Sequence, residues 1–246
     1  MKIINGSTYE GMCLEAAKII KSQMSVKPTS VLGLATGSTP IGVYKALIEM
    51  NNNKEIDFSK TTTVNLDEYV GLSGENDQSY RYFMNTNLFD HVNIDKTKTF
   101  VPNGLASDID GECKRYDKLI EDLGGVDVQI LGIGLNGHIG FNEPNAYFDK
   151  GTHQVSLTAS TIEANARFFE TIDEVPKTAV SMGIKTIMCA KKIILLANGT
   201  AKSEIIYETC FGNITPNVPA SVLQLHPDVT VIVDNDACAA IKNNIN

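Results

Sequence analysis

The sequence contains no tryptophan and only five cysteines. Nowhere does it approach the roughly 18 consecutive apolar residues that a membrane-spanning helix requires. The cysteines are scattered and no two stand at CxxC or metal-ligand spacing, which predicts reduced thiols rather than a disulfide framework. The first residues lack the apolar stretch of a signal peptide. We therefore expect a cytoplasmic protein with no membrane segment.

Positive charge is also scarce, since 21 Lys and Arg stand against 29 Asp and Glu, for a formal net charge of −8. Non-specific nucleic-acid binding depends on neutralising phosphates and is therefore not expected. A small anionic substrate needs only a few well-placed donors, so the net charge does not exclude one. Hydrophobic residues make up 43% of the chain, as in ordinary globular proteins. No linker-like or low-complexity stretch divides the sequence, and we expect a single domain over residues 1–246.

Short β-rich runs alternate with helical patterns along the chain. The predicted strands lie at 31–35, 61–66, 128–133, 193–197 and 229–233, and the predicted helices at 9–24, 40–50, 201–209 and 236–241. Several strands are nearly continuous apolar runs, which is typical of strands covered on both faces. The pattern predicts an α/β fold with a doubly wound, mostly parallel sheet and helices on both faces, a Rossmann-like three-layer arrangement. Ligands of such sheets bind beyond the carboxyl ends of the strands, so the loops there should share one edge.

The first unusual loop is Gly33-Leu-Ala-Thr-Gly-Ser-Thr-Pro40, between a predicted strand and a predicted helix. Pro40 suits the first helical position and Thr39 suits the cap. Gly37 allows a turn that directs N–H groups outward, and a helix N-terminus with unpaired donors favours a phosphate. The loop lacks the GK[ST] of a full P-loop, so a capped turn without a ligand is an equal alternative.

Asp67 follows the second predicted strand, within Asn65-Leu-Asp-Glu-Tyr69. A carboxylate at this edge can act as a general base if it reaches a substrate. Taken alone, however, the position is better interpreted as a solvated loop aspartate or a helix cap.

The third loop is Leu131-Gly-Ile-Gly-Leu-Asn-Gly-His-Ile-Gly-Phe-Asn-Glu-Pro144. Its formal GxGxxG pattern does not predict a dinucleotide site, because residues 138–144 lack the helical periodicity that such a site requires. The glycines instead predict close approach of the backbone to a small ligand. His138 and Glu143 together can shuttle a proton, with Asn136 close by. The spacing does not match HExxH, so no metal site is expected.

Two cations are candidates for binding a phosphate, Lys202 at the start of a predicted helix and Arg167 in Ala164-Asn-Ala-Arg-Phe-Phe169. A lone cation is by default a solvated surface group, so neither residue predicts a phosphate site unless it is considered together with the loops. The chain has no GxSxG nucleophile elbow and no Cys beside a His, which weighs against a serine or cysteine hydrolase.

The three loops together resemble the motifs of the glucosamine-6-phosphate deaminase family. The resemblance of the second loop covers the longer stretch Asn-Leu-Asp-Glu-Tyr-Val-Gly-Leu. Ser221-Val-Leu-Gln-Leu-His-Pro227 resembles the C-terminal signature of that family. The resemblance runs from about residue 30 to about residue 230, with the motifs in the same order. It implies the conversion of glucosamine 6-phosphate and water to fructose 6-phosphate and ammonia, an aldose–ketose isomerisation coupled to deamination in amino-sugar catabolism. It also implies that no organic cofactor or metal takes part.

The resemblance assigns a role to each candidate residue. Asp67 would remove the C2 proton, and His138 would open the pyranose ring, oriented by Glu143 with Asn136 nearby. A mobile lid around residues 158–180 would exclude water from the enolamine. The residues implied to hold the 6-phosphate are Gly37, Ser38, Thr39, Arg167 and Lys202.

The sequence departs from one branch of the family. Asn136 stands where that branch carries Asp, so a proton relay through a carboxylate at this position is not expected. The positions that align with the effector-binding residues of the hexameric, allosteric branch are Ala146, Tyr147, His153 and Val155. We therefore expect a monomer or small homo-oligomer that N-acetylglucosamine 6-phosphate does not activate. The alternatives are a 6-phosphogluconolactonase, with the same architecture and phosphate loop, and a non-catalytic sugar-phosphate-binding effector domain, for which the chain lacks a basic helix-turn-helix segment.

Overall fold

The computed structural model describes residues 1–157, 171 and 175–244. Arg167 and the greater part of the predicted lid at 158–180 lie outside these residues. Across the described residues, no helix combines the length and the apolar character needed to cross a membrane.

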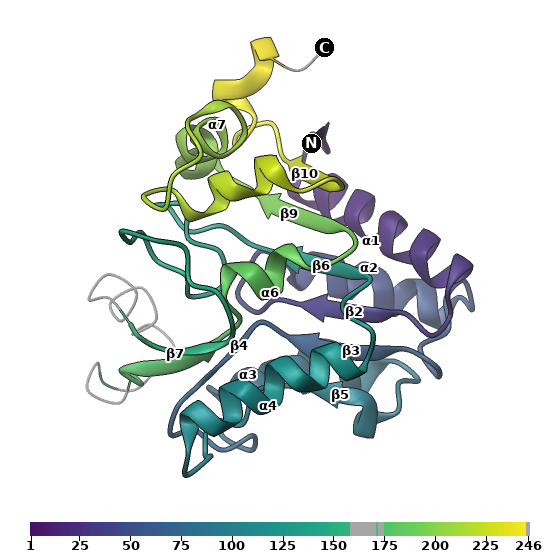
Figure 1. Cartoon of the computed structure of the whole chain (residues 1–246). Coiled ribbons are helices and arrows are strands. Elements are labelled where there is room, and N and C mark those ends of the chain that lie inside the picture. The colour runs from purple at the N-terminus through teal and green to yellow at the C-terminus, as the bar shows by residue number, and fades with distance from the viewer. Residues whose placement is uncertain (158–170, 172–174, 245–246) are drawn as a thin grey trace.

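A sheet of seven parallel strands runs through the centre of the molecule (Figure 1). The order across the sheet is β1–β10–β9–β6–β2–β3–β5, and every neighbouring pair is parallel. The bounds are Lys2–Asn5 for β1, Val31–Leu34 for β2, Thr62–Asn65 for β3, Thr99–Phe100 for β5, Val128–Leu131 for β6, Ile193–Ala197 for β9 and Val229–Val233 for β10. All five predicted strands belong to this sheet. Strands β1 and β5, which the sequence did not predict, are the two short edge strands.

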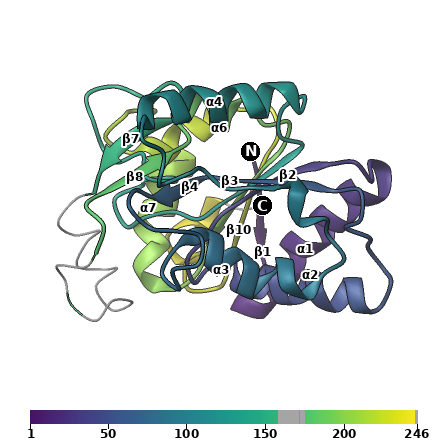
Figure 2. The same ribbon diagram turned by 90° about the horizontal axis from the view of Figure 1, so that it is seen from below.

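Helices cover both faces of the sheet, so the predicted three-layer arrangement is confirmed (Figure 2). Helices α4 (Ile109–Asp122) and α6 (Ile184–Met188) lie on one face, and α1 (Tyr9–Val26), α2 (Ile41–Asn52) and α3 (Tyr80–Asn87) on the other. Strands β2, β6, β9 and β10 are buried along their whole length, which accounts for their continuous apolar runs.

The remaining helical segments are short. Helix α7 (Ser203–Phe211) follows a 3-10 turn, and the predicted C-terminal helix is itself a 3-10 segment. Within the described residues, the 3-10 segments are η1 (Phe89–His91), η2 (Lys96–Lys98), η4 (Thr200–Lys202), η5 (Pro219–Leu225) and η6 (Ala239–Asn244).

A second, three-stranded antiparallel sheet was not predicted. It consists of β4 (Asp67–Tyr69), β8 (Thr178–Ser181) and β7 (His153–Ser156), in that order. Asp67 is the first residue of β4 and pairs with Ser181. The interpretation of Asp67 as a solvated loop residue or helix cap is therefore wrong, because pairing with a strand far later in the chain buries it.

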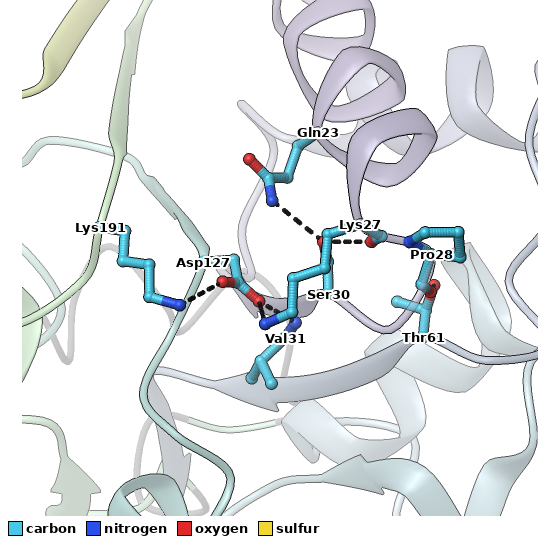
Figure 3. A network of polar contacts seen from close by, with 8 residues as sticks. All are labelled: Gln23, Lys27, Pro28, Ser30, Val31, Thr61, Asp127 and Lys191. Carbon is cyan, nitrogen blue, oxygen red and sulfur yellow. Dashed lines mark hydrogen bonds and ion pairs between the residues drawn. The ribbon is translucent and has the colours of Figure 1, made fainter.

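At the amino edge of the main sheet, Asp127 joins three segments (Figure 3). Its carboxylate accepts hydrogen bonds from Lys27 Nζ at 2.6 Å, Lys191 Nζ at 2.7 Å and the amide of Val31 at 2.8 Å. These contacts tie the end of α1, the start of β2 and the segment before β9 to the start of β6. The opposite, carboxyl edge carries the loops that the sequence analysis singled out.

Candidate active site

The loops at the carboxyl edge touch one another. Thr39 Oγ1 donates to Asn198 Oδ1 at 3.2 Å, which joins the loop after β2 to the loop after β9. Lys202 Nζ donates to the carbonyl of Ile133 at 2.5 Å, which joins the loop after β9 to the loop after β6. A Cβ built on Gly140 would lie 3.7 Å from Asp67 Oδ2, so the loop after β6 also lies against Asp67. The prediction that these loops share one edge is confirmed.

Asp67 lies buried beneath the loop after β6, with 6% of its surface exposed. Burial disfavours the charged carboxylate, and the negative charge of Glu68 adds to the effect, which together raise the pKa of Asp67 to about 8. A carboxyl group with a pKa near the working pH is suited to accepting and returning a proton.

Glu68 is a buried neighbour of Asp67 to which the sequence analysis gave no role. Its buried carboxylate accepts hydrogen bonds from the amides of Tyr69 at 2.8 Å, Tyr80 at 2.9 Å and Arg81 at 2.9 Å. It therefore ties β4 to the first turn of α3, while Asp67 faces the opposite side of the strand. Burial raises the pKa of Glu68, and the hydrogen bonds from the three amides oppose that rise. No local pattern connects Glu68 with a helix that begins twelve residues later.

Three residues of the loop after β6 form a connected polar set. Asn136 Nδ2 donates to Glu143 Oε2 at 2.6 Å, and Asn136 Oδ1 accepts the amide of His138 at 3.2 Å. His138 Nδ1 lies 3.3 Å from Glu143 Oε1, within ion-pair distance although the geometry is not that of a hydrogen bond. The arrangement turns one edge of the imidazole toward the carboxylate.

The glycines of this loop shape it in two ways. Gly137 and Gly140 have φ values of +84° and +57°, a region that favours glycine. At Gly134, a Cβ would lie 2.3 Å from the ring of His138. The expectation that the glycines make room for a ligand is therefore wrong at Gly134, where the group against the backbone is the imidazole of His138.

The loop after β2 exposes Gly37 and Ser38, and Gly37 has a φ of +91° with no atom within 4 Å of a built Cβ. Helix α2 begins at Ile41 after Pro40, one residue later than predicted, and no side chain caps it. The prediction that Thr39 caps the helix is wrong, since its hydroxyl donates to Asn198 instead.

Lys202 ends the 3-10 turn η4 and is half-buried. Burial lowers the pKa of its ammonium group. Its bond to Ile133 places the cation between the loops after β6 and β9. In the part of the chain that the structure describes, no three His, Cys, Asp or Glu side chains form a group able to hold a metal ion.

A family model described as glucosamine-6-phosphate isomerases/6-phosphogluconolactonase matches residues 7–232. The chain belongs to this family. It is 62% identical over 232 residues to a member of the family, a glucosamine-6-phosphate deaminase of Lachnoclostridium phytofermentans. The alignment covers 94% of this chain and 98% of that protein. It is 60% identical to the glucosamine-6-phosphate deaminase of Clostridium beijerinckii, with 98% and 100% covered.

Solved structures of the family agree with this placement. The structure of a monomeric glucosamine-6-phosphate deaminase matches with a TM-score of 0.95 at 47% identity, over 98% of this chain and 100% of that one. A 6-phosphogluconolactonase from Thermotoga maritima matches with a TM-score of 0.75 at 17% identity, over 95% and 98%. At that identity the second likeness shows the fold alone.

Proposed function

We propose that this protein is a glucosamine-6-phosphate deaminase, which converts glucosamine 6-phosphate and water to fructose 6-phosphate and ammonia. The observation that carries the proposal is the placement of the buried carboxyl of Asp67 beneath the loop that bears His138 and Glu143. An ester hydrolase such as a lactonase needs no base for a carbon-bound proton. The full-length identity to deaminases supports the same choice.

Asp67 is assigned as the base that takes the C2 proton. A desolvated carboxylate is a stronger base than an exposed one, since taking up a proton removes a buried charge. The enolamine formed by loss of the C2 proton accepts a proton at C1, which gives a ketimine. Water then adds to the ketimine carbon, and ammonia leaves as the C2 ketone forms.

His138 is assigned to ring opening, which needs a proton removed from the C1 hydroxyl and a proton delivered to the ring oxygen. An imidazole can do both in turn. Glu143, at 3.3 Å from Nδ1, orients the ring, and the 2.6 Å bond from Asn136 holds Glu143 in place.

The 6-phosphate is assigned to the loop after β2 and to Lys202. Backbone amides of Gly37, Ser38 and Thr39 and the ammonium of Lys202 are the donors that suit an oxyanion. Arg167, which lies outside the described residues, joins the set on the family resemblance alone. Binding energy at this remote end positions C1 and C2 for the proton transfers.

The wider setting is part of the same proposal. The protein works in the cytoplasm as a single domain without an organic cofactor, as a monomer or small homo-oligomer. The match to a monomeric deaminase supports the small assembly. The residues at Ala146, Tyr147, His153 and Val155 support the absence of activation by N-acetylglucosamine 6-phosphate.

The test is to incubate the purified protein with glucosamine 6-phosphate and to measure ammonia and fructose 6-phosphate in separate coupled assays. We expect both products in equal amounts. In parallel, 6-phosphogluconolactone is offered and its hydrolysis compared with the spontaneous rate. Lactone hydrolysis without ammonia release would replace the proposal with a lactonase, and sugar-phosphate binding without turnover would replace it with a non-catalytic effector domain.

A further inference from the structure

Tyr9 lies outside every motif that the sequence analysis singled out, yet its phenol contacts the loop after β2. The Oη donates to the carbonyl oxygens of Ser38 and Thr39, both at 3.1 Å, and accepts the amide of Gly42 at 2.9 Å. One hydroxyl group at the start of α1 therefore binds both sides of the junction between the proposed phosphate loop and α2.

The start of α2 needs this partner. Pro40 has no N–H, no side chain caps the helix, and the first backbone bond within it runs from the amide of Tyr44 to the carbonyl of Pro40. The amide of Gly42 would have no partner within the helix. A Cβ on Gly42 would lie 3.0 Å from the Tyr9 hydroxyl and 2.5 Å from Cys13 Sγ, so glycine allows the two helices to approach this closely.

The contact also sets the direction of the loop peptides. The carbonyl and the N–H of one peptide unit point in opposite directions, because the unit is planar and trans. With the Ser38 carbonyl turned toward Tyr9, the Thr39 amide points away from α1. The carbonyl oxygens, which would repel an oxyanion, are held on the Tyr9 side. The amide of Gly42 already donates to Tyr9 Oη. The amides of the loop, rather than this amide in the first turn of α2, therefore remain available to bind an anion.

We infer that Tyr9 is a positioning residue for the 6-phosphate, which keeps the carbonyls of Ser38 and Thr39 turned inward so that the loop presents its amides to the anion. The inference rests on the proposed function only in assigning the phosphate to this loop. Tyr9 itself does not touch the reacting carbons, so its contribution is to binding rather than to the proton transfers.

The test is the variant Tyr9→Phe, which keeps the ring packed against Gly42 and Cys13 and removes only the hydroxyl. The probe is inorganic phosphate, titrated calorimetrically against the full chain, together with steady-state kinetics on glucosamine 6-phosphate. The variant loses both the bond that the hydroxyl shares between the two carbonyls and the bond that it accepts from Gly42. Loss of the donated bond, which holds the loop carbonyls, should raise the Kd for phosphate and the KM about fivefold, with kcat within about twofold of the wild type. The matched control is Tyr82→Phe at an exposed tyrosine of α3, which should change neither constant.

A second variant approaches the same contact from the other side. Gly42→Ala keeps the phenol but places a methyl group against it, and should weaken phosphate binding in the same direction. A normal Kd for phosphate and a normal KM in Tyr9→Phe, with only a lower melting temperature, would reduce Tyr9 to a packing residue and overturn the inference. A wild-type chain that does not bind phosphate would overturn it as well. If the wild type binds phosphate but releases no ammonia from glucosamine 6-phosphate, the proposed function fails while the phosphate titration still decides the role of Tyr9.

Discussion

Asn136 and Glu143 are joined by a 2.6 Å hydrogen bond in which the amide donates to one carboxylate oxygen. The other oxygen of Glu143 faces His138 at 3.3 Å. An amide at position 136 can therefore stabilise an ionised Glu143, whereas an ionised carboxylate in its place would repel it. Asn at this position therefore supplies a hydrogen-bond donor to Glu143 that an ionised Asp would not.

The variant Asn136→Asp should slow turnover. A carboxylate at position 136 cannot donate the hydrogen bond that holds Glu143 and would repel it, so Glu143 would no longer orient His138 for ring opening. We expect kcat on the cyclic substrate to fall about fivefold, with the Kd for inorganic phosphate within about twofold of the wild type. The control is Asn145→Asp, which adds the same charge at an exposed position of the same loop. Unchanged turnover in Asn136→Asp would contradict the role given to Glu143.

The variant Asp67→Asn should abolish the proton abstraction while leaving the fold and the phosphate site in place. Loss of a general base typically costs about 100-fold or more in rate. We expect kcat to fall by at least that factor, while the Kd for inorganic phosphate stays within about twofold of the wild type. Ammonia release and phosphate titration measure the two quantities. A variant with near-normal turnover would remove Asp67 from the mechanism.

The same substitution should also stabilise the protein, because the pKa of Asp67 is raised from its usual 3.8 to about 8 in the folded state. Between these pH values the native state keeps a proton that the unfolded chain has lost, so stability falls as the pH rises through this window. Asparagine carries no such penalty. The melting temperature of Asp67→Asn should exceed that of the wild type by at least about 4 °C near pH 8, and the difference should shrink toward pH 4. Equal melting curves at both pH values would refute the raised pKa.

The variant Lys202→Gln should weaken phosphate binding, since it removes a cation and retains a polar side chain of similar length. A charge-assisted hydrogen bond contributes about 1.5–3 kcal/mol, so the KM and the Kd for phosphate should rise at least about tenfold. Because burial lowers the pKa of Lys202, the wild-type affinity for phosphate should itself decline at alkaline pH. Lys45→Gln, at an exposed position of α2, is the matched control and should leave both constants unchanged.

The variant Asp127→Asn should destabilise the fold without affecting turnover, because Asp127 lies at the edge of the sheet opposite the site. Burial opposes its charge, but the bonds from Lys191, Lys27 and the amide of Val31 outweigh burial and hold the pKa of Asp127 below its usual range. This stabilisation is present above pH 3.8 and is lost as the pH falls through the lowered pKa. Urea denaturation at pH 7 should show a loss of about 2 kcal/mol. Asp122→Asn, which breaks an exposed ion pair with Lys118, is the matched control and should leave the urea midpoint unchanged.

Local sequence patterns were sufficient to predict the parallel sheet and the edge that bears the site. Strands such as β9 and β10 are covered on both faces, and that burial leaves continuous apolar runs that can be read without knowing the partners. The alternation with helices then makes the strands parallel, and parallel strands bring their carboxyl-end loops to one side. Asp67, His138 and Lys202 were identified as candidates on that basis.

The surroundings of these residues, in contrast, depend on how distant segments of the chain pack together. Asp67 is buried because it pairs with Ser181, Glu68 holds a helix that starts twelve residues later, and Tyr9 reaches a loop 29 residues away. Each of these contacts joins segments whose separation is set by the packing of the whole chain, so no local period or spacing encodes it. The groups proposed to exchange protons and to bind phosphate could therefore be predicted from the sequence. Their pKa values and orientations depend on contacts between distant segments and follow only from the fold.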